Sequence, residues 1–443
     1  MDVATSFLPV LQVFAAEMSR PAFQTFLVLV SGWLLAPRRT IIGMVRASGT
    51  TRHHAAFHRL FASARWSMDA VGLAVFDLVT AMMSIVFLTI DDTLIPRTGL
   101  KIFGTGMHRD PLLSSRSHVI TRWGHCWVVV CVVLESRHFP GQHFSLPVLC
   151  RLYLNKASAQ KWQRAYRKKS ELMLEMELML EMLKILDRHC SGTGKILHLL
   201  GDSAFTAPDL LKQMPASIQV TGRVGMNARL RAPVPPRRPG QNGRPRVRGE
   251  RLPSPQEMLQ QKGLRRVRLK LFAGRAYHLR VATQVCQPFK APGRDVLVIA
   301  VEHLRGGRGT EVFYTTDLDV EVEAVLRRYS WRWSIEVTFH DTKQHLGIEE
   351  PQNRTRPAAQ RTAPTALLLY SLIVWWHEQV RQGPAPLLLT WRGKSHPSFA
   401  DMLSALRVES LESISSEGFS TPPLPPHLQK LIQHLTKLFQ LAT

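Results

Sequence analysis

Three acidic positions, far apart in the sequence, are the residues of this chain best suited to act together in chemistry. Asp91 and Asp92 close the apolar, β-branched run SIVFLTIDDT, and Asp202 closes a second apolar run within KILHLLGDSAF. A charged carboxylate at the end of a buried strand raises the free energy of the folded state unless a cation lies nearby. Together with Glu336 on a downstream helix, two strand-end aspartates would supply three oxygen ligands, the type that a hard divalent ion prefers.

Glu336 belongs to the segment YSWRWSIEVTFHDTK, residues 329–343, which the spacing of apolar residues predicts to be helical. The segment runs on from Glu321 without Gly or Pro. At about 100° per residue, four side chains fall within roughly 60° of one another: Tyr329, Arg332, Glu336 and Lys343. Such a stripe is suited to hold a charged ligand, and a solvated helix face with an Arg332–Glu336 pair at i,i+4 is the alternative.

The spacing Y-x2-R-x3-E-x6-K, downstream of two strand-end aspartates, resembles the DDE transposases of bacterial insertion sequences that carry a tyrosine-arginine-glutamate-lysine signature. The resemblance covers residues 84–380. It implies that Asp91, Asp202 and Glu336 are catalytic ligands of Mg²⁺, with Mn²⁺ as an alternative. Strand neighbours point to opposite faces, so the pattern leaves Asp91 or Asp92 open as the first ligand, and the resemblance favours Asp91.

The resemblance also implies partners and an activity. Tyr329, Arg332 and Lys343 would bind DNA, and a homodimer would hold double-stranded DNA, namely the terminal inverted repeats of the element and the target. The reaction would be cut-and-paste movement by metal-dependent cleavage and strand transfer through hairpin-ended intermediates. Two alternatives stay open: a ribonuclease-H-like nuclease or resolvase without strand transfer, and an inactive DNA-binding relic. The relic is suggested by the tandem ELMLEM at residues 171–182.

The elements that must position these residues indicate an α/β fold with a ribonuclease-H-like mixed-sheet core, a β-rich insertion, and helical N- and C-terminal regions. Alternating apolar positions predict five strands in the insertion. The expected divisions are a helical, DNA-binding region (1–83), the first part of the core (84–216), the insertion (217–320) with a basic Pro/Arg loop (232–256), the second part of the core (321–382), and a linker with a helical tail (383–443).

Several basic segments are candidates for contact with phosphate. In the loop of the insertion, Gly243-Arg244-Pro245-Arg246 resembles an AT-hook core, for which Arg244 and Arg246 would enter a minor groove; a flexible basic linker is the alternative. We also expect phosphate contacts from the loop after the first strand, at Arg97, Lys101, His108, Arg109 and Arg116, with simple solvation of the loop as the alternative for each. The first 83 residues either bind DNA or form a helical cap on the core.

The amino-acid composition indicates which classes of molecule the chain could bind. The 443 residues carry 57 Lys and Arg against 33 Asp and Glu, a net charge of +24 that favours a polyanion such as nucleic acid. Five cysteines without paired metal spacing indicate reduced thiols. No apolar run is long enough for a membrane span, and an acid near the N-terminus argues against a secretory signal. We therefore expect a bacterial cytoplasmic, nucleoid-associated protein.

Overall fold

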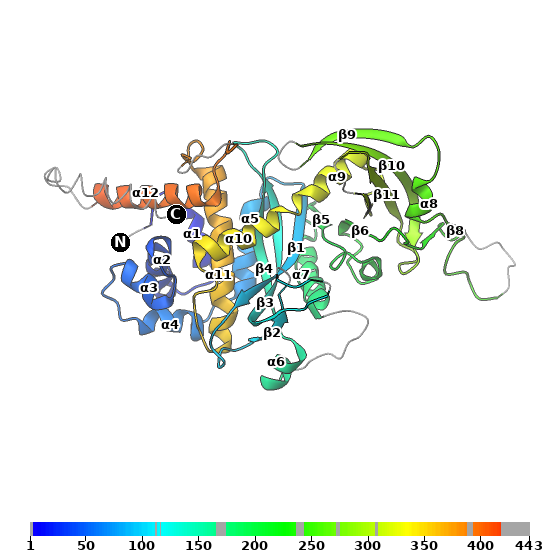
Figure 1. Cartoon of the computed structure of the whole chain (residues 1–443). Coiled ribbons are helices and arrows are strands. Elements are labelled where there is room, and N and C mark those ends of the chain that lie inside the picture. Colours follow the sequence, from blue (N-terminus) through cyan, green and yellow to red (C-terminus); the bar gives the residue numbers. More distant parts are fainter. Residues whose placement is uncertain are drawn as a thin grey trace. The chain divides into compact units, whose positions relative to one another are not determined.

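The computed structural model describes residues 3–110, 113–115, 117–164, 174–235, 243–271, 275–305, 309–387 and 393–417. The chain divides into two compact units, which are described separately. Unit 1 comprises Met1–Ala81, Asp92–Glu175 and Ser334–Thr443, and unit 2 comprises Met82–Asp91 and Met176–Trp333. Strand β1 (Ile85–Pro96) crosses the division, so its first residues belong to unit 2 and its last residues to unit 1 (Figure 1).

The prediction that the region before the first strand is helical is confirmed, and the region contains five helices. They are α1 (Leu8–Ala15), α2 (Arg20–Leu35), α3 (Ile41–Ala47), α4 (Ala55–Ala62) and α5 (Met68–Thr80).

These N-terminal helices pack into unit 1 and form no compact unit of their own. The Arg361 guanidinium, for example, donates hydrogen bonds to the carbonyls of Ala64 (2.8 Å) and Trp66 (2.9 Å). The Trp33 indole donates to the carbonyl of Leu346 at 2.9 Å. This packing agrees with the alternative in which residues 1–83 form a helical cap on the core. DNA binding by these residues stays a prediction.

The sheet of unit 1 contains β2 (Gly106–Arg109), β3 (Thr121–Glu135) and β4 (His143–Tyr153). Strand β3 is buried from residue 124 to 134, as a continuous Val-rich run would be when both faces are covered. Strand β4, which the sequence analysis did not predict, pairs antiparallel with β3. Both strands contact α5, and β4 also contacts α10 (Ser334–Leu346) and α11 (Arg356–Trp375).

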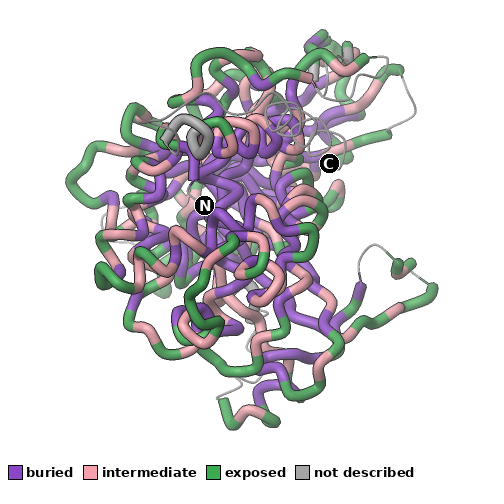
Figure 2. Tube along the Cα trace, turned by 90° about the vertical axis from the view of Figure 1, so that its left-hand side faces the viewer, coloured by how far each residue is buried: buried purple, intermediate pink, exposed green. Residues whose placement is uncertain are grey.

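The remaining elements of unit 1 are α6 (Lys156–Lys161), a π-helical turn η2 (Trp376–Val380) that continues α11, and α12 (Phe399–Glu417). Helix α11 is buried from Ala358 to Val374 except at two positions, which makes it the core helix of the unit; such buried stretches are purple in Figure 2. The part of the predicted helical tail from residue 418 onward lies outside the described residues, as does part of the first ELMLEM copy.

Unit 2 begins with three parallel strands. The first part of β1 pairs with β5 (Ile196–Leu200), and β5 pairs with β6 (Gln219–Arg223). Taken with β3 and β4, the strand order is β4-β3-β1-β5-β6. A mixed sheet in this order is the ribonuclease-H-like core that was predicted.

The β-rich insertion is an antiparallel extension of this sheet. Its main strands are β9 (Arg265–Leu271), β10 (Arg275–Pro288), β11 (Val296–His303) and β12 (Thr310–Thr315), and the short strands β7 (Leu230–Arg231) and β8 (Arg251–Leu252) pair at one end of β10. The predicted first strand of the insertion needs correction, because β6 pairs parallel with β5 on one edge and antiparallel with β12 on the other. It therefore belongs to the core.

Helix α9 (Val322–Trp331) packs on the insertion through one apolar face. Val322, Val325 and Leu326 are buried in a cluster with Ile299 and Phe313. The other helices of unit 2 are α7 (Leu174–Cys190), η1 (Pro208–Lys212) and α8 (Pro255–Leu259). Among the described helices of the chain, none is long and apolar enough to cross a bilayer.

Candidate active site

Parallel pairing of β1 with β5 places Asp91 and Asp202 at equivalent positions. The pairing ends at Thr89↔Leu200, and each aspartate follows two residues later. Neighbouring strands lie about 4.8 Å apart, so the two segments run side by side up to Thr89 and Leu200. The sequence analysis predicted both acids at strand ends. That is right for Asp202, but wrong for Asp91 and Asp92, because β1 continues to Pro96.

The two neighbouring aspartates of β1 have different surroundings. The Asp91 carboxylate is half-buried and pairs with the Arg332 guanidinium, with 3.3 Å between Oδ2 and Nη1. Asp92 is exposed, and its Oδ2 accepts from the thiol of Cys126 at 3.3 Å. Adjacent strand residues point to opposite faces, and Asp91 contacts Arg332, a residue of the tyrosine-arginine-glutamate-lysine motif.

Asp202 shapes the turn that follows β5. Its Oδ1 accepts backbone N–H groups from Ala204 at 2.9 Å and from Phe205 at 3.1 Å. Gly201 fits here because a Cβ atom at that position would meet the side chain of Thr206 at 2.5 Å. Backbone hydrogen bonds to an aspartate in this arrangement fix its side chain. One carboxylate oxygen of Asp202 is thus held by the protein itself.

The predicted continuous helix over residues 329–343 is wrong, because the chain forms two helices with Arg332 and Trp333 in a turn between them. At the junction the N–H groups of Arg332 and Trp333 donate to carbonyls three residues back, at 3.3 Å each, and the Ser330 hydroxyl bonds the carbonyl of Arg327 at 2.6 Å. Exchange of i−4 for i−3 bonding interrupts the helical ladder. The four motif residues therefore do not share one continuous helical stripe.

Tyr329 belongs mainly to the core of unit 2. Its ring packs on the apolar cluster of the insertion, 4.8 Å from the Phe313 ring. Burial raises the pKa of the Tyr329 hydroxyl, and the Arg332 and Arg223 guanidinium groups oppose that shift. The hydroxyl therefore stays protonated among charged groups that include Asp202.

The two tryptophans that follow Tyr329 differ in their contacts and in their exposure. Trp331 meets Phe87 of β1 edge to face at 5.1 Å, whereas Trp333 is 53% exposed. Only Trp333 is accessible for stacking on a base.

Glu336 and Lys343 lie on α10 in unit 1. The helix is anchored to β4 by Thr338, whose hydroxyl donates to the carbonyl of Ser145 at 2.7 Å. Glu336 is half-buried in the first turn. Burial lowers the pKa of Lys343, while the Glu349 carboxylate nearby opposes that shift. Lys343 is thus a partly desolvated ammonium group.

Of the predicted phosphate contacts in the loop after the first strand, Arg97 and His108 are buried, Lys101 and Arg109 are exposed, and Arg116 lies outside the described residues. Arg97 is internal: its guanidinium donates to the carbonyls of Glu349 (2.5 Å) and Ile348 (3.0 Å), so the expected contact with phosphate is wrong. Arg244 and Arg246 are exposed in an irregular segment of the insertion. Their accessibility is consistent with DNA contact and with a basic linker.

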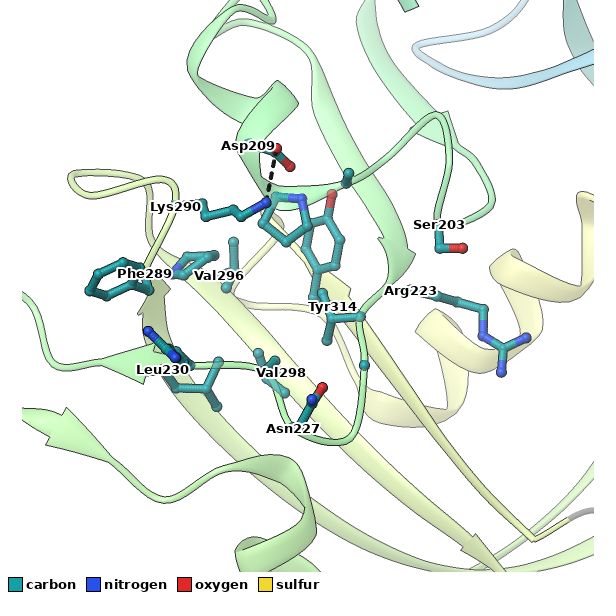
Figure 3. Close-up of a pocket in the computed structure, with 17 residues that line it drawn as sticks. Ser203, Asp209, Arg223, Asn227, Leu230, Phe289, Lys290, Val296, Val298 and Tyr314 are labelled. Atoms are coloured by element: carbon teal, nitrogen blue, oxygen red, sulfur yellow. Dashed lines mark hydrogen bonds and ion pairs between the residues drawn. The ribbon is translucent and has the colours of Figure 1, made fainter. Parts of the chain in front are cut away.

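A pocket of about 510 Å³ begins at Ser203, the residue after Asp202 (Figure 3). Its floor is formed by core strands of unit 2 and includes Tyr314, whose hydroxyl donates to the carbonyl of Thr206 at 2.5 Å. At its rim Lys290 pairs with Asp209 at 3.2 Å. The sequence analysis missed this pocket, because its walls come from four separate segments of the chain.

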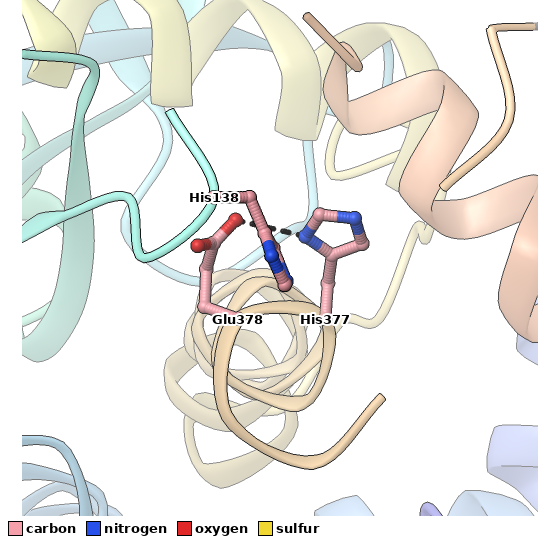
Figure 4. Close-up of side chains that lie close together, drawn as sticks. All are labelled: His138, His377 and Glu378. Carbon is pink, nitrogen blue, oxygen red and sulfur yellow. Dashed lines mark hydrogen bonds and ion pairs between the residues drawn. The ribbon is translucent and has the colours of Figure 1, made fainter. Parts of the chain in front are cut away.

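A second group of ligand-type side chains lies in unit 1, where atoms of His138, His377 and Glu378 come within 4.8 Å of one another (Figure 4). The N–H of Ala385 donates to His377 Nε2 at 2.9 Å, so the ring proton is on Nδ1 and is donated to Glu378 Oε1 at 2.8 Å. Glu378 Oε2 accepts from the Ser136 hydroxyl at 3.0 Å.

A metal ion at this group would displace one of these bonds, because a neutral imidazole has a single lone pair. Only His138 offers a buried nitrogen that has no partner among the described residues. We interpret the group as a buried hydrogen-bonded network that joins the π-helical turn to the loop after β3.

The strand order and the two aspartates that follow the paired part of β1 and β5 agree with a ribonuclease-H-like fold. The family model of the DDE superfamily endonucleases matches residues 12–281, and the chain belongs to this family. No curated protein matches the chain. Among solved structures, the chain is similar to the piggyBac transposase in its synaptic complex with hairpin DNA, with 12% identity and a TM-score of 0.41 over 94% of this chain and 75% of that one.

Proposed function

We propose that the chain is a transposase that cleaves DNA and transfers the cut strand, using Asp91, Asp202 and Glu336 as ligands for Mg²⁺ or Mn²⁺. The observation that supports the proposal is the parallel register of β1 and β5, whose last printed pair, Thr89 and Leu200, precedes Asp91 and Asp202 by two residues each. Oxygen-only donors of this kind fit a hard divalent ion. When bound, such ions activate water or a 3′-hydroxyl and stabilise the leaving oxygen.

Glu336 is the third ligand in this proposal. It follows Arg332 by four residues, and a span of that length covers at most about 14 Å. Arg332 itself pairs with Asp91. The short covalent connection from Glu336 to Arg332, the partner of Asp91, supports Glu336 as the third ligand.

The other motif residues would orient the DNA. A guanidinium has five N–H donors in a planar fork, so Arg332 can keep its contact with Asp91 and also bind a phosphate oxygen. Lys343, Arg244 and Arg246 would add contacts to the backbone, which the charge of +24 favours. We further propose that a homodimer binds the terminal repeats of a bacterial insertion sequence and its target DNA.

The test is cleavage of labelled DNA that carries the ends of the element, by purified protein in Mg²⁺ and in EDTA. We expect cleavage in Mg²⁺ only, loss of cleavage in Asp91→Asn and Glu336→Gln proteins, and retention in Asp92→Asn, which is the matched control on the same strand. Joining of the cut end to a second DNA separates a transposase from a nuclease. Cleavage at the parent rate by both Asp91→Asn and Glu336→Gln would refute the proposal.

A relic that binds DNA and cleaves nothing is the other outcome of the same assay. Binding by the parent protein without cleavage in Mg²⁺ or Mn²⁺ would identify it.

A further inference from the structure

Three arginines of the insertion surround one aromatic ring. The guanidinium carbons of Arg248, Arg231 and Arg229 lie 4.0, 5.5 and 5.7 Å from the centre of the Phe289 ring. We call these four residues the Phe289 cluster. Phe289 lies on the wall of the pocket that begins at Ser203 (Figure 3).

The backbone builds the cluster. Strand β7 pairs with the end of β10 so that Arg231 is opposite Gln287, and the N–H of Phe289 donates to the carbonyl of Arg229 at 2.9 Å. Arg229 directly precedes β7 and Arg231 ends it, and both guanidinium groups face the Phe289 ring. Arg248 arrives from the chain before β8 and donates from Nε to the carbonyl of Phe289 at 3.1 Å.

Within the described part of the chain, the charges of the cluster are not balanced. No ion pair there joins any of the three arginines to a carboxylate. Arg231 Nε is buried without a hydrogen-bond partner among the same residues. A single guanidinium would be enough to cover the ring, and two more add mutual repulsion. An arrangement of this kind is suited to bind an anion.

We propose that the Phe289 cluster binds the phosphate backbone of the DNA strand whose reacting phosphate lies at Asp202. A guanidinium stacked on a ring presents its N–H groups at its edge, where two of them match two phosphate oxygens. The pocket links the residue after Asp202 with Phe289 along one surface of unit 2. Arg229 and Arg248 are exposed and accessible to a strand that follows this surface. The inference rests on the proposed function, because it takes DNA as the substrate.

The experiment measures affinity for a fluorescein-labelled DNA duplex by anisotropy over a range of salt concentrations. EDTA is present, so the result does not depend on cleavage. Loss of one phosphate contact lowers the slope of log affinity against log salt by about 0.9. We expect that change, with about a tenfold loss of affinity, for Arg248→Ala, and twice the change in slope for Arg229→Ala/Arg248→Ala.

The matched control is Arg251→Ala, which removes the same charge from an exposed arginine three residues away that is paired with Glu257. Its slope should equal that of the parent. Phe289→Leu keeps all three charges and removes the stacking platform, so it should weaken binding without the loss of a charge. Circular dichroism melts identify any variant that fails to fold.

If Arg248→Ala and Arg251→Ala bind alike while the parent binds DNA, the assignment of the cluster is overturned and the proposed function stands. If the parent binds no DNA in this assay, both are overturned.

Discussion

Asp202 allows the catalytic and structural roles of one carboxylate to be separated. Its Oδ1 accepts two backbone N–H groups, at 2.9 and 3.1 Å, in the turn after β5. Asp202→Asn keeps an oxygen acceptor at this position and removes the charge, whereas Asp202→Ala removes both. Loss of two such bonds from a half-exposed side chain costs about 1–2 kcal/mol of unfolding free energy. For Asp202→Asn we expect a change within about 0.5 kcal/mol.

Both variants should lose DNA cleavage by at least about 100-fold, because a ligand that contributes about 3 kcal/mol to the transition state is removed. Urea denaturation measures the stability, and Mg²⁺-dependent cleavage of labelled element ends measures the activity. Cleavage at the parent rate by Asp202→Asn would refute the catalytic role. Equal destabilisation of the two variants would refute the account of the turn.

Three further predictions concern the surroundings of the site and the response to pH. Arg332→Ala should lower the unfolding free energy by about 1–3 kcal/mol, and a double-mutant cycle with Asp91→Asn should give a coupling energy above about 0.5 kcal/mol; additivity would contradict the ion pair. Burial raises the pKa of Asp341 to about 6, so the folded state binds this proton more tightly than the unfolded state and loses stability as pH rises from 4 to 6. Above pH 7, the free energy of unfolding of Asp341→Asn, measured by urea titration, should therefore exceed that of the parent by up to about 3 kcal/mol. Burial lowers the pKa of His198 to about 4, so below pH 6.5 the unfolded state binds a proton that the folded state does not, and the free energy of unfolding of the parent falls by up to about 3 kcal/mol by pH 4. His198→Gln should reduce that fall. An unchanged dependence of stability on pH in this variant would show that other groups cause the fall.

Local patterns predicted the framework of the site well. The β-branched runs before Asp91 and Asp202 are β1 and β5, and the alternating segments after residue 217 are strands. Apolar periodicity and strand composition report on the burial of a few neighbouring residues, and that information is present in the sequence. The order of strands, acids and insertion along the chain then indicated a ribonuclease-H-like core.

The same patterns failed where the outcome depended on distant parts of the chain. No local signal ended a helix at Arg332, because residues 321–343 contain neither Gly nor Pro. Arg97 was expected to face phosphate, yet carbonyls more than 200 residues away take its hydrogen bonds. The Phe289 cluster was missed for a similar reason, since its residues come from three segments of the insertion.

The sequence by itself determined the types of the acidic and basic residues, their order, and the helices and strands that carry most of them. The tertiary structure alone decided the parallel register of β1 and β5, the pairing of Arg332 with Asp91, and the meeting of three arginines at one ring. The physical reason is that strand register and side-chain contacts depend on the free energy of packing between segments far apart along the chain, which no window of neighbouring residues contains.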